Sequence, residues 1–391
     1  MIQKPRLVII VGGLHPGGAE RQLALLLRHA APHVDAHVCT REAGGSLEPE
    51  VAEVDTLHRI SGSHSARLRS LSAIVKSVGP HRVVGWHFYT NAYSALVARR
   101  HGCSSIGGIR GSLAHEIELQ PKAWRFNLHL PNQIVANSRG ARDECSALRK
   151  NVLYVPNAVE PPDAATSFTR AESLALLGVP GARPVVALIG HLRPEKRGDR
   201  FLEALAFARD RGCAWQGLFI GGGPLLATLQ SKAAELRLTP DDVKFAGQIA
   251  EPKSVMSALD LVAITSDTEG TSNALLEAMA AGVAVLTTRV GELGRSLQSG
   301  AEAWLADRSS DDVGRALVQA FDARSRSVIA ANGLIRARNE FSLAAALAAW
   351  SDALGLGSRL KTSSADAERQ VGPLSGRAGS EERDVKDECV G

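Results

Sequence analysis

The chain has 391 residues, of which 45% are hydrophobic and 22% are charged. This length predicts two domains of about 100–200 residues each, and the composition is typical of a globular protein with sizeable cores. No stretch approaches roughly 18 unbroken apolar residues, so we expect no transmembrane helix. Glycine, histidine and proline interrupt the N-terminal apolar run, which indicates a first core strand rather than a signal peptide.

Charge is distributed unevenly along the chain. Residues 1–160 hold 19 Lys and Arg residues against 12 Asp and Glu residues, a balance of +7, whereas residues 161–391 have a balance of −3. Eleven of the twelve histidines also lie in the first part. This asymmetry indicates two halves with different partners, and ordinary drift of composition is the alternative.

The five cysteines are scattered and form no CxxC pair. This pattern indicates reduced, mostly buried thiols in a cytoplasmic protein, rather than a disulfide framework or a zinc site. The cysteines are Cys39, Cys103, Cys145, Cys213 and Cys389.

The first half alternates short β-rich runs with amphipathic helical stretches, which predicts helices packed around a parallel sheet. The predicted strands are 6–13, 35–40, 82–87, 104–110 and 133–138, and the predicted helices are 19–30, 65–78, 93–100 and 141–150. After residues 152–159, clustered prolines and small polar residues at 160–172 predict a linker.

A second series of the same kind follows. Its predicted strands are 184–192, 215–223, 243–247, 259–266 and 283–288, with helices that include 201–211 and 225–236. Two similar modules favour an α/β fold of two doubly wound domains that face a cleft, with ligands at the carboxyl ends of the strands.

The expected organisation has four parts. They are an N-terminal domain at 1–160, a C-terminal domain at 161–340, a last helix at 341–356 and a polar tail at 357–391. Trp350 is the expected anchor of the last helix. The tail is poor in hydrophobic residues and is predicted to be disordered.

Glycines follow the first predicted strand in "VGGLHPGGAER". Gly12, Gly13, Gly17 and Gly18 open a loop ahead of a helix, where backbone N–H groups can approach a phosphate. The spacing is not GxGxxG, and no acidic residue follows a second strand at the usual offset. A simple tight turn is therefore the alternative.

Cations crowd the end of the first strand of the second domain, in "GHLRPEKRGD". His191, Arg193, Lys196 and Arg197 can hold the phosphates of a leaving nucleotide without a metal. A solvated charged loop is the alternative. The glycines of "IGGGP" at 220–224 add a second turn, which can also reflect sharp backbone geometry alone.

Two glutamates flank a predicted helix start in "TEGTSNALLEAMAAG" at 268–282. Ser272 or Asn273 can cap this helix, and its first free N–H groups form an anion site. Glu277 lies about one turn into the helix, where a carboxylate suits the two hydroxyls of a ribose. Glu269 precedes the helix and is expected to face a sugar; a capping acid plus a surface glutamate is the alternative.

Over residues 5–350 the chain resembles retaining glycosyltransferases of family 4, the group 1 transferases with the GT-B fold. The resemblance is carried by "GGAERQ", "NS" at 137–138, "VPNAV", "GHLRPEKRGD", "GGGP" and above all "SDTEGTSNALLEAMAAGVAVLTT", which matches the E-x7-E element of the family. It implies transfer of a hexosyl-type sugar from a nucleotide-diphosphate sugar to an acceptor hydroxyl, in polysaccharide, lipopolysaccharide or other glycoconjugate assembly.

The resemblance also implies roles for individual residues. Gly17 and Gly18 would face the donor phosphates, the positive pair of the family maps onto His191 and Lys196, and Glu269 would hold the sugar. Glu277 would take the ribose. Main-chain contacts to the donor would come from Gly270, Thr271, Ser272, Asn273, Ala274 and Leu275.

Three positions depart from the family pattern. His191 replaces the usual arginine, so Arg193 is the alternative phosphate contact, and Ala284 replaces a usual proline. Arg295 stands where a glutamate is common, with Glu292 three residues earlier. These departures affect the detail of the donor contacts.

Acceptor contacts are expected from the first domain. By the resemblance, Arg110 in "GIRGS" is the first candidate for a catalytic residue beside the reacting carbon, and His87 is the second. Either can instead be a structural hydrogen-bonding residue. His15 is a further candidate for contact with the acceptor.

The expected partners are a nucleotide-sugar donor and a glycan or lipid-linked acceptor, with no nucleic acid, metal or other cofactor. The basic first domain suggests an anionic membrane surface, on the inner face of the plasma membrane, as a further partner; a soluble acceptor is the competing interpretation. The candidate basic face comprises Arg67, Arg69, Lys76, Arg99, Arg100, Lys122 and Arg125. The alternative functions are an idle nucleotide-sugar-binding subunit and a GT-B-fold nucleotide-sugar epimerase.

Overall fold

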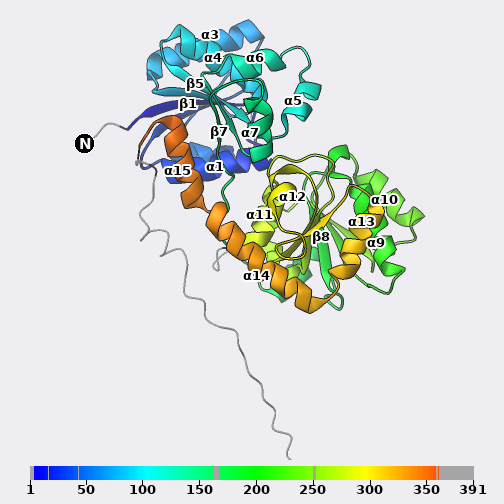
Figure 1. Cartoon of the computed structure of the whole chain (residues 1–391). Helices are drawn as coiled ribbons and strands as arrows, with labels where there is room; N and C mark the ends of the chain where they lie inside the picture. The colour runs from blue at the N-terminus through cyan, green and yellow to red at the C-terminus, as the bar shows by residue number, and fades with distance from the viewer. Residues whose placement is uncertain are drawn as a thin grey trace, which may run out of the picture.

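The chain forms two parallel sheets, each covered by helices (Figure 1). This computed structural model describes residues 4–15, 17–42, 44–162, 167–249, 252–357 and 360. The first sheet has seven strands in the order β3-β2-β1-β4-β5-β6-β7, and the second has six in the order β10-β9-β8-β11-β12-β13. The predicted fold of two doubly wound α/β domains is confirmed.

The first domain follows the predicted alternation of strands and helices. Its strands are β1 (Arg6–Val11), β2 (Asp35–Thr40), β3 (Thr56–Arg59), β4 (Arg82–Gly85), β5 (Ser104–Ile109), β6 (Gln133–Ala136) and β7 (Val152–Tyr154). Its helices are α1 (Gly18–Ala30), α2 (Glu48–Val54), α3 (His64–Val78), η1 (Phe88–Thr90), α4 (Asn91–Arg100), α5 (Leu113–Leu119), α6 (Trp124–His129) and α7 (Arg139–Ser146). The sequence analysis missed β3, because this four-residue edge strand is nowhere fully buried and has no apolar run.

The second domain repeats the scheme. Its strands are β8 (Val185–Ile189), β9 (Gln216–Ile220), β10 (Val243–Gly247), β11 (Leu261–Ile264), β12 (Ala284–Thr288) and β13 (Trp304–Ala306). Its helices are α8 (Arg170–Leu177), η2 (Pro194–Lys196), α9 (Gly198–Arg209), α10 (Leu226–Glu235), η3 (Pro252–Ala258), α11 (Asn273–Ala280), α12 (Gly291–Ser296), α13 (Ser310–Gln319) and α14 (Ala323–Glu340). Every residue of β8, β9, β11 and β12 is buried, as a parallel sheet covered on both faces requires.

The last helix, α15 (Leu343–Leu354), returns to the first domain (Figure 1). Its apolar face completes the core that contains β1 and α1. The rings of Trp350 and Trp86 stack with their centroids 5.4 Å apart. The expected helix and its tryptophan anchor are therefore present, and the anchor holds the first domain. Apart from Gly357 and Leu360, the polar tail lies outside the described residues.

Strand order reverses at one point in each sheet, between β1 and β4 and between β8 and β11. Ligands of doubly wound folds bind beyond the carboxyl ends of the strands at such switch points. The segments that leave these four strands are 12–17, 86–90, 190–197 and 265–272. Most of the site residues predicted from the sequence lie on or directly after these segments.

The described cysteines, Cys39, Cys103, Cys145 and Cys213, are all free thiols. Burial raises the pKa of the Cys39 and Cys145 thiols to about 12, which leaves them protonated and unreactive. Cys389 lies outside the described residues. Within the described part of the chain, every helix is too short or too polar to cross a membrane.

Candidate functional site

The starts of α1 and α11 are joined across the two domains. The Asn273 side-chain amide donates a hydrogen bond of 2.7 Å to the carbonyl oxygen of Gly18, and Asn157 donates one of 2.7 Å to the Asn273 oxygen. Neither helix has a side-chain cap, since Gly17 has no side chain and Ser272 makes no capping bond. The predicted cap at Ser272 or Asn273 is therefore wrong: Asn273 bridges the domains instead. The two uncapped N-termini together favour an anion.

A second set of contacts fixes the loop that precedes α11. The Thr271 hydroxyl donates a 2.6 Å hydrogen bond to the carbonyl oxygen of Asn137 in the first domain. Gly270 packs so closely against Arg110 that a methyl group on it would overlap the Arg110 carbonyl oxygen. Buried Glu292 accepts a 2.6 Å hydrogen bond from the Arg139 N–H and donates its own N–H to Gly270. Glu292 is thus an interdomain contact that the sequence analysis left without a role.

The two residues predicted to hold phosphate and sugar contact each other. Lys196 Nζ lies 2.6 Å from Glu269 Oε1, and the Ser266 hydroxyl donates a 2.6 Å hydrogen bond to the same oxygen. Both side chains are mostly buried, so their charges are only partly screened by water. A cation and a carboxylate are therefore held side by side at the switch point of the second sheet.

A network of charged residues fastens the Lys196 loop to the Glu269 loop. Asp267 accepts a 2.7 Å hydrogen bond from buried Arg200 and one of 3.0 Å from Arg197. Arg200 also donates to the carbonyl oxygen of Thr265 at 2.5 Å. Arg197, predicted as a cation near phosphates, is instead neutralised by Asp267 and Asp199. The sequence offered no signal for Arg200 and Asp267, because the pairing forms only in three dimensions.

His191 and Arg193 lie on the exposed part of the same loop. The loop packs backbone against backbone on "GGG": the N–H of Leu192 donates to Gly222 at 2.8 Å, and at Gly221 (φ 142°) a Cβ would overlap the Gly190 carbonyl oxygen. Burial and the nearby Arg193 charge lower the pKa of His191 below its ordinary value of 6.5. His191 is therefore neutral at pH 7.

Glu277 lines an open cavity of about 80 Å³ between the domains. It is four residues beyond Asn273, so both side chains lie on one face of α11. The cavity is also lined by the cationic side chains of Arg21, Arg28 and Lys253. Asn273, which bridges the starts of α1 and α11, also lines this cavity. Glu277 therefore lies next to the two helix starts.

The acceptor candidates of the first domain occupy two different settings. His87 Nε2 lies 3.2 Å from Glu20 Oε1, and the His87 ring stacks on Tyr89. His15 is exposed and lies 3.5 Å from Glu42. Both histidines lie on loops that follow the strands at the switch point of the first sheet. Each contacts a carboxylate.

Arg110, predicted as a catalytic residue, packs its guanidinium against an aromatic ring, and its role in catalysis stays a prediction. Its guanidinium carbon lies 3.8 Å from the centroid of the Trp86 ring, and its Nε donates to the Trp86 carbonyl oxygen at 3.4 Å. Burial lowers the pKa of Arg110 to about 9. The side chain turns into the interface with α15, where Trp350 lies 5.4 Å away. The Arg110 carbonyl oxygen, in contrast, lies beside Gly270 in the loop that precedes α11.

Comparison with known proteins identifies the second domain. A family model described as "Glycosyl transferases group 1" matches residues 183–323. Over these residues the second domain is similar to the group 1 glycosyltransferases. This match covers the Lys196 loop, the Asp267 network and the start of α11, and it confirms the resemblance found in the sequence.

Curated relatives match parts of the chain. A 2-deoxystreptamine glucosyltransferase of Streptomyces kanamyceticus is 32% identical over 216 residues, which cover 54% of this chain and 55% of that one. A lipopolysaccharide core biosynthesis mannosyltransferase of Rhizobium meliloti is 31% identical over 186 residues, which cover 45% and 52%. The chain thus spans about half the length of these two relatives.

Solved structures share the fold over most of the chain. Anabaena HepE in complex with UDP and glucose has a TM-score of 0.79 at 18% identity, with 90% of this chain and 100% of that chain covered. WaaG, a glycosyltransferase involved in lipopolysaccharide biosynthesis, has a TM-score of 0.69 at 15% identity, with 90% and 99% covered. The predicted GT-B fold of two Rossmann-like domains is confirmed.

Arg200→Ala is expected to destabilise the second domain. It removes the buried partner of Asp267 and of the Thr265 carbonyl oxygen, so the free energy of unfolding should fall by about 2–3 kcal/mol. Urea denaturation measures this change. Arg324→Ala, an exposed arginine of α14, is the matched control. Equal midpoints for the two variants would show that the network does not hold the loops.

Gly270→Ala is expected to loosen the contact between the domains, because its methyl group overlaps the Arg110 carbonyl oxygen. Overpacking of about 1–3 kcal/mol should accelerate amide hydrogen exchange roughly tenfold at the start of α11 and in residues 110–116. Gly222→Ala, where a methyl group meets no atom of the described residues within 4 Å, is the control. Unchanged exchange in Gly270→Ala would contradict the tight approach.

Proposed function

We propose that the protein is a retaining glycosyltransferase that moves a hexosyl-type sugar from a nucleotide-diphosphate sugar to an acceptor hydroxyl. The observation that carries this proposal is the convergence of two uncapped helix N-termini beside the Lys196–Glu269 pair, within a group 1 domain. Such an arrangement binds a diphosphate and a sugar next to each other. A site for an anion alone would have no use for the Glu269 carboxylate, which instead suits the hydroxyls of a sugar.

In this proposal the diphosphate lies at the starts of α1 and α11. Backbone N–H groups around Gly18 and Ser272–Leu275 receive it, and Lys196 turns from Glu269 toward the phosphate. Glu269 is then released to accept hydrogen bonds from sugar hydroxyls. Glu277 faces the adjoining cavity, where its carboxylate suits the two hydroxyls of the ribose.

The reaction that fits retention takes place on one face of the sugar. The bond between the anomeric carbon and the donor phosphate oxygen breaks, and the acceptor oxygen bonds to the anomeric carbon from the same side. The acceptor proton passes to the leaving phosphate oxygen. Lys196, the helix N-termini and His191 or Arg193 stabilise the negative charge on that phosphate, so this scheme assigns charge neutralisation to the protein without a metal or other cofactor.

The acceptor in this proposal is a glycan or a lipid-linked glycan that binds to the first domain. Loops with His15 and His87 leave the switch point of that domain and carry polar groups able to bind hydroxyls. The names of the relatives support a role in glycoconjugate assembly, since one acts in lipopolysaccharide core biosynthesis. We propose that this step takes place in the cytoplasm at the membrane's inner face.

Lys196→Ala and Glu269→Ala are each expected to reduce kcat by about a hundredfold or more, because each removes a charge that acts on the transition state. Release of free nucleotide from a panel of uridine, guanosine and adenosine diphosphate sugars, with and without acceptor extract, measures the reaction. Glu195→Gln, whose carboxylate makes no hydrogen bond or ion pair in the described structure, is the control.

Near-normal kcat in Glu269→Ala would remove the role of that residue. If no donor is consumed while a nucleotide sugar still binds, the protein is an idle binding subunit. Conversion of the donor to its epimer, without release of nucleotide, would identify an epimerase. The panel therefore separates the proposal from both alternatives.

The donor KM is expected to depend on pH through His191. The pKa of this residue is lowered in the donor-free protein, so its ring is neutral at pH 7 and becomes a cation only in acid. Protonation adds a charged hydrogen bond to the diphosphate, so KM should fall by roughly fivefold to tenfold as the pH falls through the His191 pKa. KM measured across this range tests the sign.

Two variants isolate this effect. His191→Arg restores a permanent cation, so its KM should be low and independent of pH. His191→Gln should keep a high KM that is also independent of pH. A pH dependence that persists in both variants would assign the titration to another group.

A further inference from the structure

Cations outnumber carboxylates on the outer face of the first domain, where Glu116 and Glu118 of α5 are the two carboxylates within residues 56–142. Residues 56–115 contain eight Lys and Arg residues and no Asp or Glu, and residues 119–142 contain four and none. Seven of these cations lie on or between α3, α4 and α6, and no ion pair is formed by any of them within the described structure. They are Arg67, Arg69, Lys76, Arg99, Arg100, Lys122 and Arg125.

Large apolar side chains are exposed on the same face. Leu119 and Phe126, at the end of α5 and in α6, are 63% and 60% exposed, and Leu96 of α4 and Leu130 are also exposed. The helices adjoin, since the Ala92 N–H of α4 donates a 3.1 Å hydrogen bond to the side chain of Asn127 in α6. The helices that carry Leu96 and Phe126 are therefore neighbours.

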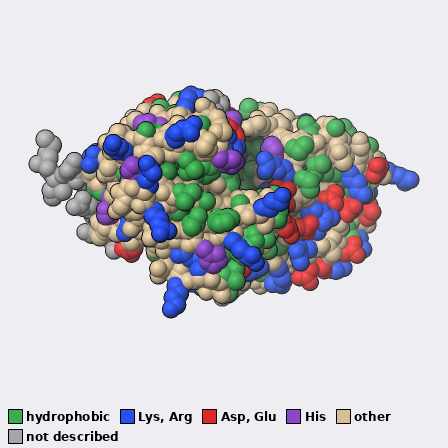
Figure 2. Space-filling model, turned by 90° about the horizontal axis from the view of Figure 1, so that it is seen from above, with side chains coloured by type: hydrophobic (Ala, Val, Ile, Leu, Met, Phe, Trp, Pro, Cys, Tyr) green, Lys and Arg blue, Asp and Glu red, His purple; other side chains and the backbone are tan. Residues whose placement is uncertain are grey.

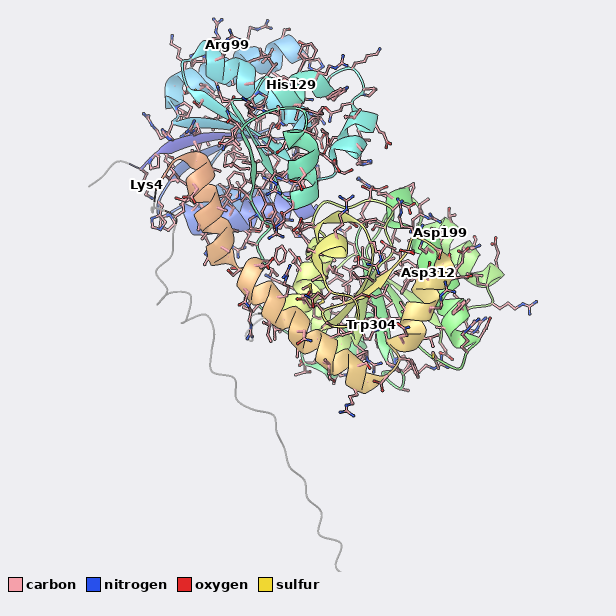
Figure 3. The ribbon with its side chains drawn as sticks, in the orientation of Figure 1. Lys4, Arg99, His129, Asp199, Trp304 and Asp312 are labelled. Carbon is pink, nitrogen blue, oxygen red and sulfur yellow. The ribbon has the colours of Figure 1, made fainter. Side chains whose placement is uncertain are left out.

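Figure 2 looks onto this face from above and shows hydrophobic side chains in the middle of the first domain, with Lys, Arg and His around them. Acidic side chains gather instead on the second domain. Arg99 and His129 lie on the upper side of the first domain in Figure 3, on α4 and α6. We call the surface of α4 and α5–α6, with its flanking cations, the basic apolar face.

We propose that the basic apolar face docks on an anionic lipid bilayer, with Leu119 and Phe126 inserted between headgroups. Unpaired cations around an apolar centre complement anionic headgroups above an acyl layer. Nucleic acid would satisfy the cations but would leave the leucines in water. An acidic protein groove is less suited to the wide spread of the cations over three helices.

Docking of this face would bring the site to the membrane. Ser112 caps the start of α5, and its hydroxyl lies 3.5 Å from the Thr268 hydroxyl in the donor loop. α5 thus runs from the edge of the site to Leu119. This part of the inference rests on the proposed function, since it places a lipid-linked acceptor beside the donor. Binding to the bilayer itself does not depend on it.

Co-sedimentation of the full chain with vesicles tests the proposal. The vesicles are phosphatidylcholine with or without phosphatidylglycerol, at low and high salt. The wild type should bind only the anionic vesicles at low salt. Arg99→Gln/Arg100→Gln/Arg125→Gln should bind about a hundredfold more weakly, and Leu119→Ser/Phe126→Ser roughly tenfold more weakly.

The matched control is Leu176→Ser/Ile335→Ser, which removes two side chains of the second domain that are each 58% exposed. It should bind like the wild type, and circular dichroism checks that all variants fold. The proposal is overturned if the wild type fails to bind anionic vesicles at low salt, or if Leu119→Ser/Phe126→Ser binds as tightly as the control. The proposal is also overturned if the variants change binding to heparin but leave binding to vesicles unchanged.

Donor turnover without vesicles is the second measurement. All of these variants should retain it, because none of the substituted residues belongs to the donor site. Vesicle binding without any turnover would refute the proposed function and leave the docking surface supported. Turnover without vesicle binding would do the reverse.

Discussion

The hydrogen bonds of Asn273 determine how the two domains of this protein meet. Its amide joins the Gly18 carbonyl oxygen at the start of α1, and its oxygen receives the amide of Asn157. The approach is close, because a Cβ on Gly18 would lie 3.0 Å from the Asn273 side-chain nitrogen and would have to displace it. The free N–H groups of two helices are thereby directed at one place, and the other groups of the site are arranged around it.

The domains are also connected at a double crossing of the chain. The N–H of Val159, on the way to the second domain, donates a 2.8 Å hydrogen bond to Phe341, on the way back. α15 then packs Trp350 against Trp86, and the buried Arg110 guanidinium lies over the Trp86 ring. The two segments that connect the domains are thus hydrogen-bonded to each other. Any change of the angle between the domains must therefore bend both segments together or break the contacts of α15.

The Lys196–Glu269 pair balances two charges at the switch point of the second sheet. Each side chain neutralises the other at 2.6 Å, and Asp267 holds the Lys196 loop through Arg197 and Arg200. Most of the reorganisation needed to bind an anion is therefore confined to one lysine. A preorganised site of this kind spends less of its binding energy on rearrangement.

Sequence patterns alone determined the class of fold and the segments that form the site, because alternating apolar runs, glycine turns and the E-x7-E spacing are local signals. They placed Lys196 and Glu269 on loops and Glu277 on the helix that follows, as the structure has them. The domain boundaries and the roles of these residues stay predictions. Only the tertiary structure decided which side chains meet. The Arg110 side chain packs on Trp86, and Asn273 bridges the domains rather than capping a helix. β3 forms the edge of the first sheet. Local sequence patterns do not predict these pairings, because each depends on residues far apart in the chain.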